Sequence, residues 1–90
     1  MKNRIILNPQ EEEGNFSFKD VEQYMTKGFQ QKFGILAPVI ALTSLQKILE
    51  TYPNNADYFQ TFIYKDDFLE IKYWCINDIE HITFLLPEEY

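Results

Sequence analysis

Residues 38–52 carry the clearest helical pattern in the chain. Pro38 suits the first turn of a helix, where its missing N–H leaves no bond unmade. Pro53-Asn54-Asn55 then ends the pattern. The apolar positions recur at the spacing of one face of an amphipathic helix and are Ala41, Leu42, Leu45, Ile48, Leu49 and Tyr52. The residues predicted for the other side of this helix are Ser44, Lys47, Glu50 and Thr51.

The last third of the chain has the pattern of β-strands. Three runs rich in β-branched and aromatic residues, Tyr58–Lys65, Phe68–Ile76 and Ile79–Leu86, are separated by the polar pairs Asp66-Asp67 and Asn77-Asp78. Short polar pairs between such runs predict two hairpins with two-residue turns. These turns place four pairs of residues opposite each other: Tyr64 with Leu69, Phe62 with Ile71, Cys75 with Glu80, and Trp74 with His81.

Side chains alternate along a strand, so each face of the predicted sheet can be described. One face is almost wholly apolar, and we expect it to receive the helix; it consists of Tyr58, Phe62, Tyr64, Leu69, Ile71, Tyr73, Cys75, Ile82, Phe84 and Leu86. The other is mixed, but more apolar than a wet sheet face; it consists of Phe59, Thr61, Ile63, Phe68, Lys72, Trp74, Ile76, Ile79, His81, Thr83 and Leu85. We expect part of this second face to be covered, either by residues 1–33 or by a second copy of the protein.

The first third of the chain is less regular. Arg4–Leu7 predicts a short strand, and the charged run Glu11–Asn15 predicts a solvated connection. Residues 16–33 fit two interpretations: a helix capped near Ser17, or an extended segment over Tyr24–Phe29, where Gly28 weakens a helix. The whole pattern predicts one α+β domain over residues 1–90, with one central helix on an antiparallel sheet of about three to five strands. Residues 1–20 are expected to be peripheral or flexible.

Composition excludes several classes of function. Fourteen acidic residues stand against eight Lys and Arg, which gives a net charge of −6. A general nucleic-acid surface needs clustered cations, and so does attraction to anionic lipid, so we expect no direct binding to either nucleic acid or a membrane. Neither the apolar run of a secretion signal nor a long uncharged apolar stretch is present in the sequence, so we expect the protein to be cytoplasmic.

Catalytic chemistry has few candidates. Cys75 and His81 are the only thiol and the only imidazole. The predicted strands place them on opposite sheet faces, which argues against a nucleophilic pair. We interpret Cys75 as a buried core thiol and expect no metal site, since one Cys and one His lack further ligands at metal-binding spacing. We therefore expect a protein without cofactors that is not an enzyme.

The sharper hypothesis is a protein-binding module. Phe59 and Trp74, in one row with His81, are predicted to supply apolar contact area, as aromatic anchors do at interfaces. The carboxylates predicted to steer a partner are Asp66, Asp67, Asp78 and Glu80. Spaced carboxylates beside exposed aromatics suit an inhibitor that imitates DNA to a nucleic-acid enzyme. The alternatives are an ordinary acidic surface, and a structural homodimer formed through the mixed sheet face.

Three segments resemble a known family. Tyr24–Gln30, Asp57–Phe62 and Ile82–Tyr90 are similar, in that order, to the motifs of the staphylococcal domain-of-unknown-function family numbered 960. The terminal Leu85-Leu86-Pro87-Glu88-Glu89-Tyr90 is the most specific of these motifs. The chain departs from the family in a longer N-terminal extension. It also lacks a His-Ser-Gln-Glu-Pro-like segment and runs straight through Phe68–Ile76.

The resemblance implies context rather than chemistry, because the family has no established activity. Its members occur on phages and mobile resistance cassettes, where they can lie near a protein that inhibits uracil-DNA glycosylase by imitating DNA. This context favours an acidic binding protein encoded by a mobile element. The resemblance also implies a strand over residues 23–29, followed by Gln31–Leu36 leading into the helix.

Overall fold

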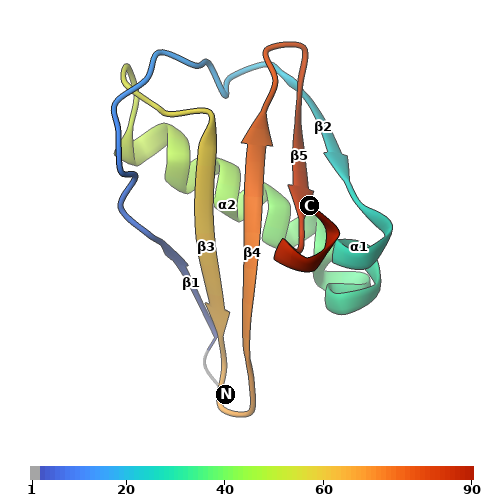
Figure 1. Ribbon diagram of the computed structural model, residues 1–90. Helices are drawn as coiled ribbons and strands as arrows, with labels where there is room; N and C mark the ends of the chain where they lie inside the picture. The colour runs from blue at the N-terminus through green and yellow to red at the C-terminus, as the bar shows by residue number, and fades with distance from the viewer. Residues whose placement is uncertain (1–2) are drawn as a thin grey trace.

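The computed structural model describes residues 3–90. Five strands, two helices and two short 3-10 turns follow one another along the chain (Figure 1). In order they are β1 (Arg4–Leu7), β2 (Glu22–Met25), α1 (Lys27–Phe33), η1 (Gly34–Leu36), α2 (Ala37–Thr51), β3 (Phe59–Lys65), β4 (Glu70–Asn77), β5 (His81–Leu85) and η2 (Pro87–Glu89). The fold is α+β, as predicted, with one long helix packed on a five-stranded sheet.

The sheet is mixed rather than antiparallel throughout. Its strand order is β1-β3-β4-β5-β2. The central hairpins and the β1–β3 pair are antiparallel, but β2 runs parallel to β5. The prediction of a purely antiparallel sheet was therefore wrong at one edge. The reason is that β2 enters from a long crossing segment, which permits a parallel pairing that a short hairpin does not allow.

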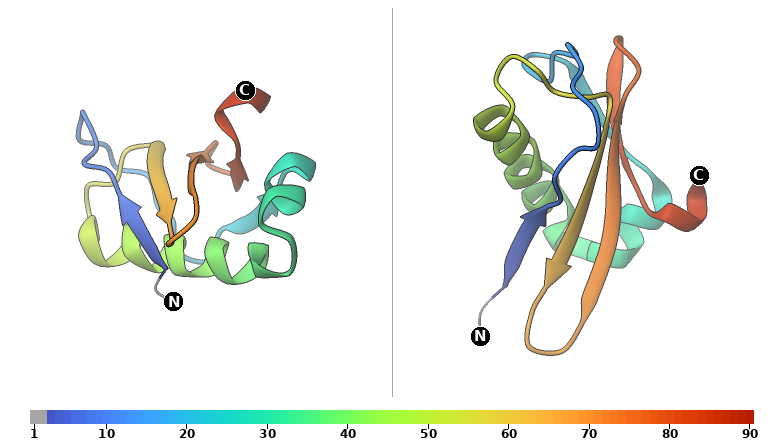
Figure 2. Two further views of the ribbon diagram at one scale, coloured as in Figure 1. Left: turned by 90° about the horizontal axis from the view of Figure 1, so that it is seen from below. Right: turned by 60° about the vertical axis from the view of Figure 1, so that its left-hand side comes forward.

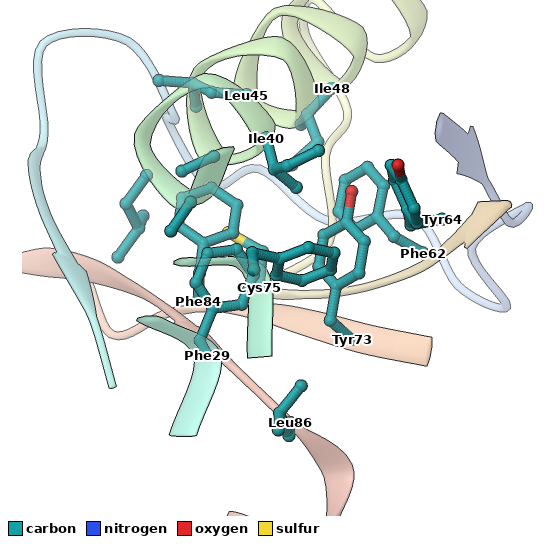
Figure 3. Packing of buried hydrophobic residues seen from close by; sticks show 14 of the residues in the cluster. Phe29, Ile40, Leu45, Ile48, Phe62, Tyr64, Tyr73, Cys75, Phe84 and Leu86 are labelled. Carbon is teal, nitrogen blue, oxygen red and sulfur yellow. The ribbon is translucent and has the colours of Figure 1, made fainter. Parts of the chain in front are cut away.

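Both helices cover the same face of the sheet. Figure 2 shows α1 and α2 together on one side and the C-terminal turn rising on the other. The core between the layers is rich in aromatic rings (Figure 3). Phe62 and Tyr73 stack with their ring centroids 5.1 Å apart, and Phe29 and Phe33 of α1 each meet Tyr73 edge-on at 5.5 Å. The inner face predicted from alternation is confirmed at its centre, whereas Tyr58 and Leu69 at its ends are each 47% exposed.

Two residues of α2 lie on the opposite side of the helix from the one predicted. Leu42 was expected in the core and Ser44 in solvent, yet Leu42 is 53% exposed and Ser44 is fully buried. Ser44 Oγ lies 2.6 Å from the hydroxyl of Tyr73 in β4 and also donates to the carbonyl of Ile40. A small polar residue is needed at this position because it meets a large hydroxyl-bearing ring. The buried positions of α2 are Ala37, Ile40, Ala41, Ser44, Leu45 and Ile48.

The strand register also differs from the prediction. Tyr64 lies opposite Ile71, and Phe62 lies opposite Tyr73, so the β3–β4 pairing is shifted by two positions. In the β4–β5 pairing the shift is four positions: Cys75 lies opposite Phe84, and Trp74 opposite Leu85 rather than His81. Both shifts are even, so every side chain keeps its predicted face.

Polar side chains explain where these turns form. The carboxylate of Asp66 accepts hydrogen bonds from the backbone N–H groups of Phe68 and Leu69. In the second turn, Asn77 Oδ1 accepts from Ile79 N and Asp78 Oδ1 accepts from His81 N. Asp and Asn commonly hold turns in this way, from the position before the central residues. The predicted turn centres were therefore set too early in the sequence.

Residues 16–33 combine the two interpretations left open by the sequence. Residues 22–25 form the strand β2, and α1 begins at Lys27 after Thr26, whose hydroxyl accepts from Phe29 N. The predicted cap near Ser17 does not begin a helix. The strand implied for residues 23–29 is therefore confirmed only as far as Met25.

The N-terminal extension belongs to the domain over its described part. Strand β1 pairs with β3 along its length, and Phe18 is 2% exposed in the core. The amide of Asn77 donates to the carbonyl of Ser17 at 2.7 Å. Strand β1 and Phe18 are thus packed on the domain, whereas the predicted solvated run at Glu11–Glu13 is exposed. Met1 and Lys2 lie outside the described residues. Strands β1 and β2 lengthen the sheet at its two edges, and the segment after β1 meets the mixed face at Thr61, whose hydroxyl accepts from Asn8 Nδ2.

Candidate protein-interaction surface

The sheet face turned away from the helices is the first candidate site. We call it the outer surface and define it by the outward side chains of β3, β4 and β5: Phe59, Thr61, Ile63, Lys72, Trp74, Ile76, Thr83 and Leu85. No helix of the described chain lies on it, and in Figure 2 the C-terminal turn rises on this side. Most of its side chains are partly exposed, and Leu85 is buried.

Phe59 and Trp74 form the aromatic centre of this surface, as predicted. Their rings meet edge-on with centroids 4.9 Å apart, across the β3–β4 pair. Tyr90 extends the group beyond Trp74, with ring centroids 5.6 Å apart. The result is a continuous row of rings. Such rigid aromatic area is typical of the anchors that dominate binding energy at interfaces.

His81 does not join this row. The residue opposite Trp74 is Leu85, four positions further along β5, which corresponds to about 13 Å along a strand. His81 instead packs edge-on against Tyr24 of β2 at 4.8 Å, and its Nε2 lies 3.0 Å from Asp78 Oδ2. The predicted row of Phe59, Trp74 and His81 was therefore wrong in its third member. The cause is the shifted β4–β5 register.

The four predicted steering acids lie at two ends of the sheet. Asp66 and Asp67 belong to the β3–β4 turn, whereas Asp78 and Glu80 belong to the β4–β5 turn at the opposite end (Figure 1). Asp66 is committed to its turn, and the hydrogen bond from Phe68 N is the main cause that holds the pKa of its carboxyl below the usual range. The structure therefore separates these carboxylates into two small groups instead of one row.

The C-terminal turn borders the outer surface and is fixed by one carboxylate. Glu89 accepts hydrogen bonds from the hydroxyl of Thr26 at 2.6 Å, from Gly28 N at 2.9 Å and from Leu86 N at 2.8 Å. The bond from Thr26 is the main cause that lowers the pKa of Glu89. The Glu89 carboxylate lies at the start of α1, where its negative charge also meets the positive end of the helix dipole. It keeps the final residue, Tyr90, against Trp74.

The structure places Cys75 and His81, the two candidate reactive side chains, on opposite faces of the sheet. Cys75 is fully buried among apolar residues, and this burial raises the pKa of its thiol. It lies on the inner face, whereas His81 lies on the outer one. Within residues 3–90 no group of three or more His, Cys, Asp or Glu side chains is arranged to hold a metal ion.

Two features of this molecule escaped the sequence reasoning. Tyr90 was not recognised as a neighbour of Trp74, because the contact depends on the path of the C-terminal turn. The second feature is a group of exposed apolar residues on the helix layer: Ile35, Leu36, Val39 and Leu42. The sequence carries no signal for it, because the burial of Ser44 on the opposite side of α2 is seen only in the structure.

Comparisons with known proteins add no further information about the site. The chain matches no protein-family model, no curated protein and no solved structure. The resemblance to the family numbered 960 therefore stays a prediction.

Proposed function

We propose that the protein is a non-enzymatic module that binds another protein through its outer surface. The observation that carries this proposal is the row of aromatic rings on a sheet face that no helix covers. Apolar area of this kind, surrounded by polar side chains, is typical of protein-interaction sites. Trp74 is the central anchor, with Phe59 on one side and Tyr90 on the other.

Charges at the two ends of the sheet set the orientation of the partner. Asp78, Glu80 and Glu22 surround the end that holds His81. At the other end both signs are present: Lys65 and Lys72 lie near Asp66, Asp67 and Glu70. A partner with cations near the first end suits this distribution. The proposal does not extend to imitation of DNA, because the carboxylates lie in two groups and Asp66 caps its own turn. A phage or mobile-element origin remains part of the proposal on the strength of the resemblance.

The test compares matched variants as affinity baits. The first variant, Thr83→Lys, places a long charged side chain on the β5 side of the outer surface, opposite Ile76, without removing a buried ring. Its control, Thr51→Lys, makes the same change at the exposed end of α2. A third bait, Trp74→Ala, removes the anchor itself. Circular dichroism establishes that each bait is folded.

The baits are incubated with lysate of a staphylococcal host, the group that the resemblance implies, at low and at high salt. We expect one protein to be retained stoichiometrically by the wild-type chain and by Thr51→Lys, and to be lost from Thr83→Lys and Trp74→Ala. Retention that falls at high salt supports the role of the acids. Equal retention on all four baits, or recovery of the bait protein alone, refutes the proposal, and the second result favours the homodimer.

A further inference from the structure

Strand β1 presents unpaired backbone groups at one edge of the sheet (Figure 1). Asn8 N donates to Thr61 O at 2.9 Å, so these two residues form a hydrogen-bonded pair of the antiparallel β1–β3 ladder. Hydrogen-bonded and non-hydrogen-bonded pairs alternate along such a ladder, so Ile6 also directs its backbone groups toward β3. The N–H and C=O groups of Ile5 and Leu7 therefore point away from β3, where no strand lies beside them within residues 3–90.

An apolar groove lies below this free edge, on the helix side of the sheet. It has a volume of about 410 Å³; Ile5 and Tyr64 line it from the sheet, and Leu36 and Val39 line it from the helix layer. Leu36 and Val39 are 45% and 59% exposed, and the sheet ends at β1. A further strand beside β1 extends the inner sheet face over these two side chains. The free edge thus supplies hydrogen-bonding groups, and the groove supplies apolar contact area, for the same added strand.

The sequence of β1 is complementary to itself. A second β1 can lie antiparallel to the first with the two Ile6 residues opposite each other. Ile5 of each copy then lies opposite Leu7 of the other, and Arg4 lies opposite Asn8. Because Ile5 and Leu7 carry the outward backbone groups, this register places each N–H of these two residues opposite a C=O. Apolar side chains meet apolar side chains at Ile5–Leu7, and no two like charges lie opposite each other.

The same register fits the groove. Ile5 and Leu7 have Tyr64 and Phe62 as their β3 partners, so their side chains lie on the inner face, toward the helix layer. Leu7 of the second copy therefore comes beside Ile5 on the groove side, and each copy extends an apolar side chain over the groove of the other. A second copy of β1 thus satisfies both the free backbone groups and the apolar groove.

The other edge of the sheet is protected against such pairing. Natural sheets protect their edges with charged side chains, proline or a covering segment. In β2, Glu22, Gln23 and Tyr24 are exposed, and the polar Gln23 occupies an inner-face position beside Ile82. Ile5–Leu7 of β1 contains no charged, polar or proline residue. The contrast between the two edges indicates that β1 is the strand that pairs.

We infer that two copies of the chain associate through β1, about a two-fold axis, into one continuous ten-stranded sheet. Most soluble homodimers have this symmetry, in which the same patch of each copy contacts the other. The helix layers of both copies lie on one face of the joined sheet. Both outer surfaces lie on the opposite face, so the dimer presents the proposed protein-binding surface twice. The dimer itself does not depend on the proposed function.

A cysteine at the centre of the pairing tests the register. The two Ile6 residues form a non-hydrogen-bonded pair, whose Cα atoms lie about 4.5 Å apart, within the range of a disulfide. We expect Ile6→Cys to give a reducible covalent dimer in mild oxidant. The matched control, Ile63→Cys, makes the same change at the β3 neighbour of Ile6, where the two copies are about 14 Å apart. Native Cys75 is fully buried, so it forms no cross-link.

Two further measurements address the dimer without a cross-link, on variants that circular dichroism shows to be folded. In sedimentation equilibrium, Ile6→Lys places two ammonium groups opposite each other, and we expect the dissociation constant of the dimer to rise about tenfold or more. Thr83→Lys, on the outer surface, should leave this constant unchanged. In the wild-type protein, amide exchange of Ile5 and Leu7 should slow by about tenfold or more between dilute and concentrated samples, while that of Gln23 stays the same.

Three outcomes would overturn the inference. A monomer at every concentration, with equal cross-linking of Ile6→Cys and Ile63→Cys, would exclude pairing through β1. A dimer that Thr83→Lys abolishes and Ile6→Lys leaves intact would place the contact on the outer surface. Exchange of the Ile5 and Leu7 amides that does not change when a dimer forms would show that another part of the chain makes the contact. Ile6→Lys leaves the outer surface in place, so the proposed function is tested separately by the pull-down with Thr83→Lys.

Discussion

A hydrogen bond between Ser44 and Tyr73 links the long helix to the centre of the sheet. Both side chains are fully buried, and their oxygens lie 2.6 Å apart. Because Ser44 donates to the carbonyl of Ile40, the Tyr73 hydroxyl donates to Ser44 Oγ. The orientation of α2 that brings these two hydroxyls together also buries Ile40 and Leu45 against the sheet and leaves Val39 and Leu42 exposed. Ser44→Ala, Tyr73→Phe and the double variant together measure its contribution.

The expected magnitudes follow from which group each variant leaves without a partner. Ser44→Ala leaves a buried Tyr73 hydroxyl unsatisfied, which costs about 1–3 kcal/mol of unfolding free energy. The higher helix propensity of Ala offsets about 0.5 kcal/mol of this loss. Tyr73→Phe removes the donor while Ser44 keeps its bond to Ile40, so we expect a cost of about 0.5–1.5 kcal/mol. The double variant leaves no unpaired hydroxyl and should cost less than the sum of the two single changes, by about 1 kcal/mol or more.

Urea unfolding gives the measurement. Trp74 is the only tryptophan and reports on the sheet by fluorescence, while far-ultraviolet circular dichroism reports on α2. With a slope of about 1–3 kcal/mol per molar urea, a loss of 2 kcal/mol lowers the midpoint by about 0.7–2 M. Additive effects of the two single variants would show that the hydroxyls are not coupled. That result would refute a stabilising hydrogen bond between α2 and β4.

Three further predictions concern individual residues. Hydrogen bonds lower the pKa of Glu89 in the folded protein. The stabilising effect of its carboxylate is therefore present above the unfolded pKa of about 4.3 and is lost as the pH falls through the lower folded value. Unfolding free energies measured from pH 7 to pH 3 should fall more steeply for the wild type than for Glu89→Gln. Cys75 should not react with a thiol reagent at pH 8 in the native protein and should react fully in urea, because the buried thiol has a raised pKa; fast reaction of the native protein would contradict its placement in the core. Ile79 has a φ of 84° and is 77% exposed. The variant Ile79→Gly should therefore raise the thermal midpoint by relieving about 1 kcal/mol of backbone strain. A lower midpoint would show that the turn depends on the Ile79 side chain.

Hydrophobic periodicity was sufficient for the main elements of the fold. The helix predicted over residues 38–52 corresponds to α2 at Ala37–Thr51, and the three predicted C-terminal strands correspond to β3, β4 and β5. The apolar inner face at Phe62, Tyr73 and Phe84 is confirmed by their burial. These features depend on local spacing, and local spacing is present in the sequence.

Register was less predictable, and the candidate site depends on it. The two turns lie later in the sequence than predicted. The prediction placed Asp66 and Asn77 inside the turns, whereas each precedes its turn and accepts a backbone N–H from it. Side chains kept their faces because the shifts were even, so Phe59 and Trp74 were correctly grouped. His81 was not, since its neighbour depends on how far along β5 the pairing runs.

The sequence by itself determined the α+β class, the central helix, the hairpin strands and the burial of Cys75. Each of these follows from spacing within one segment, where the pattern of apolar residues limits the possible structures. Only the tertiary structure decided the parallel pairing of β2, the inward position of Ser44, the outward stripe at Val39 and Leu42, and the contact of Tyr90 with Trp74. These features join residues that are far apart in the chain, so their geometry depends on how whole elements pack and not on the pattern within any one of them.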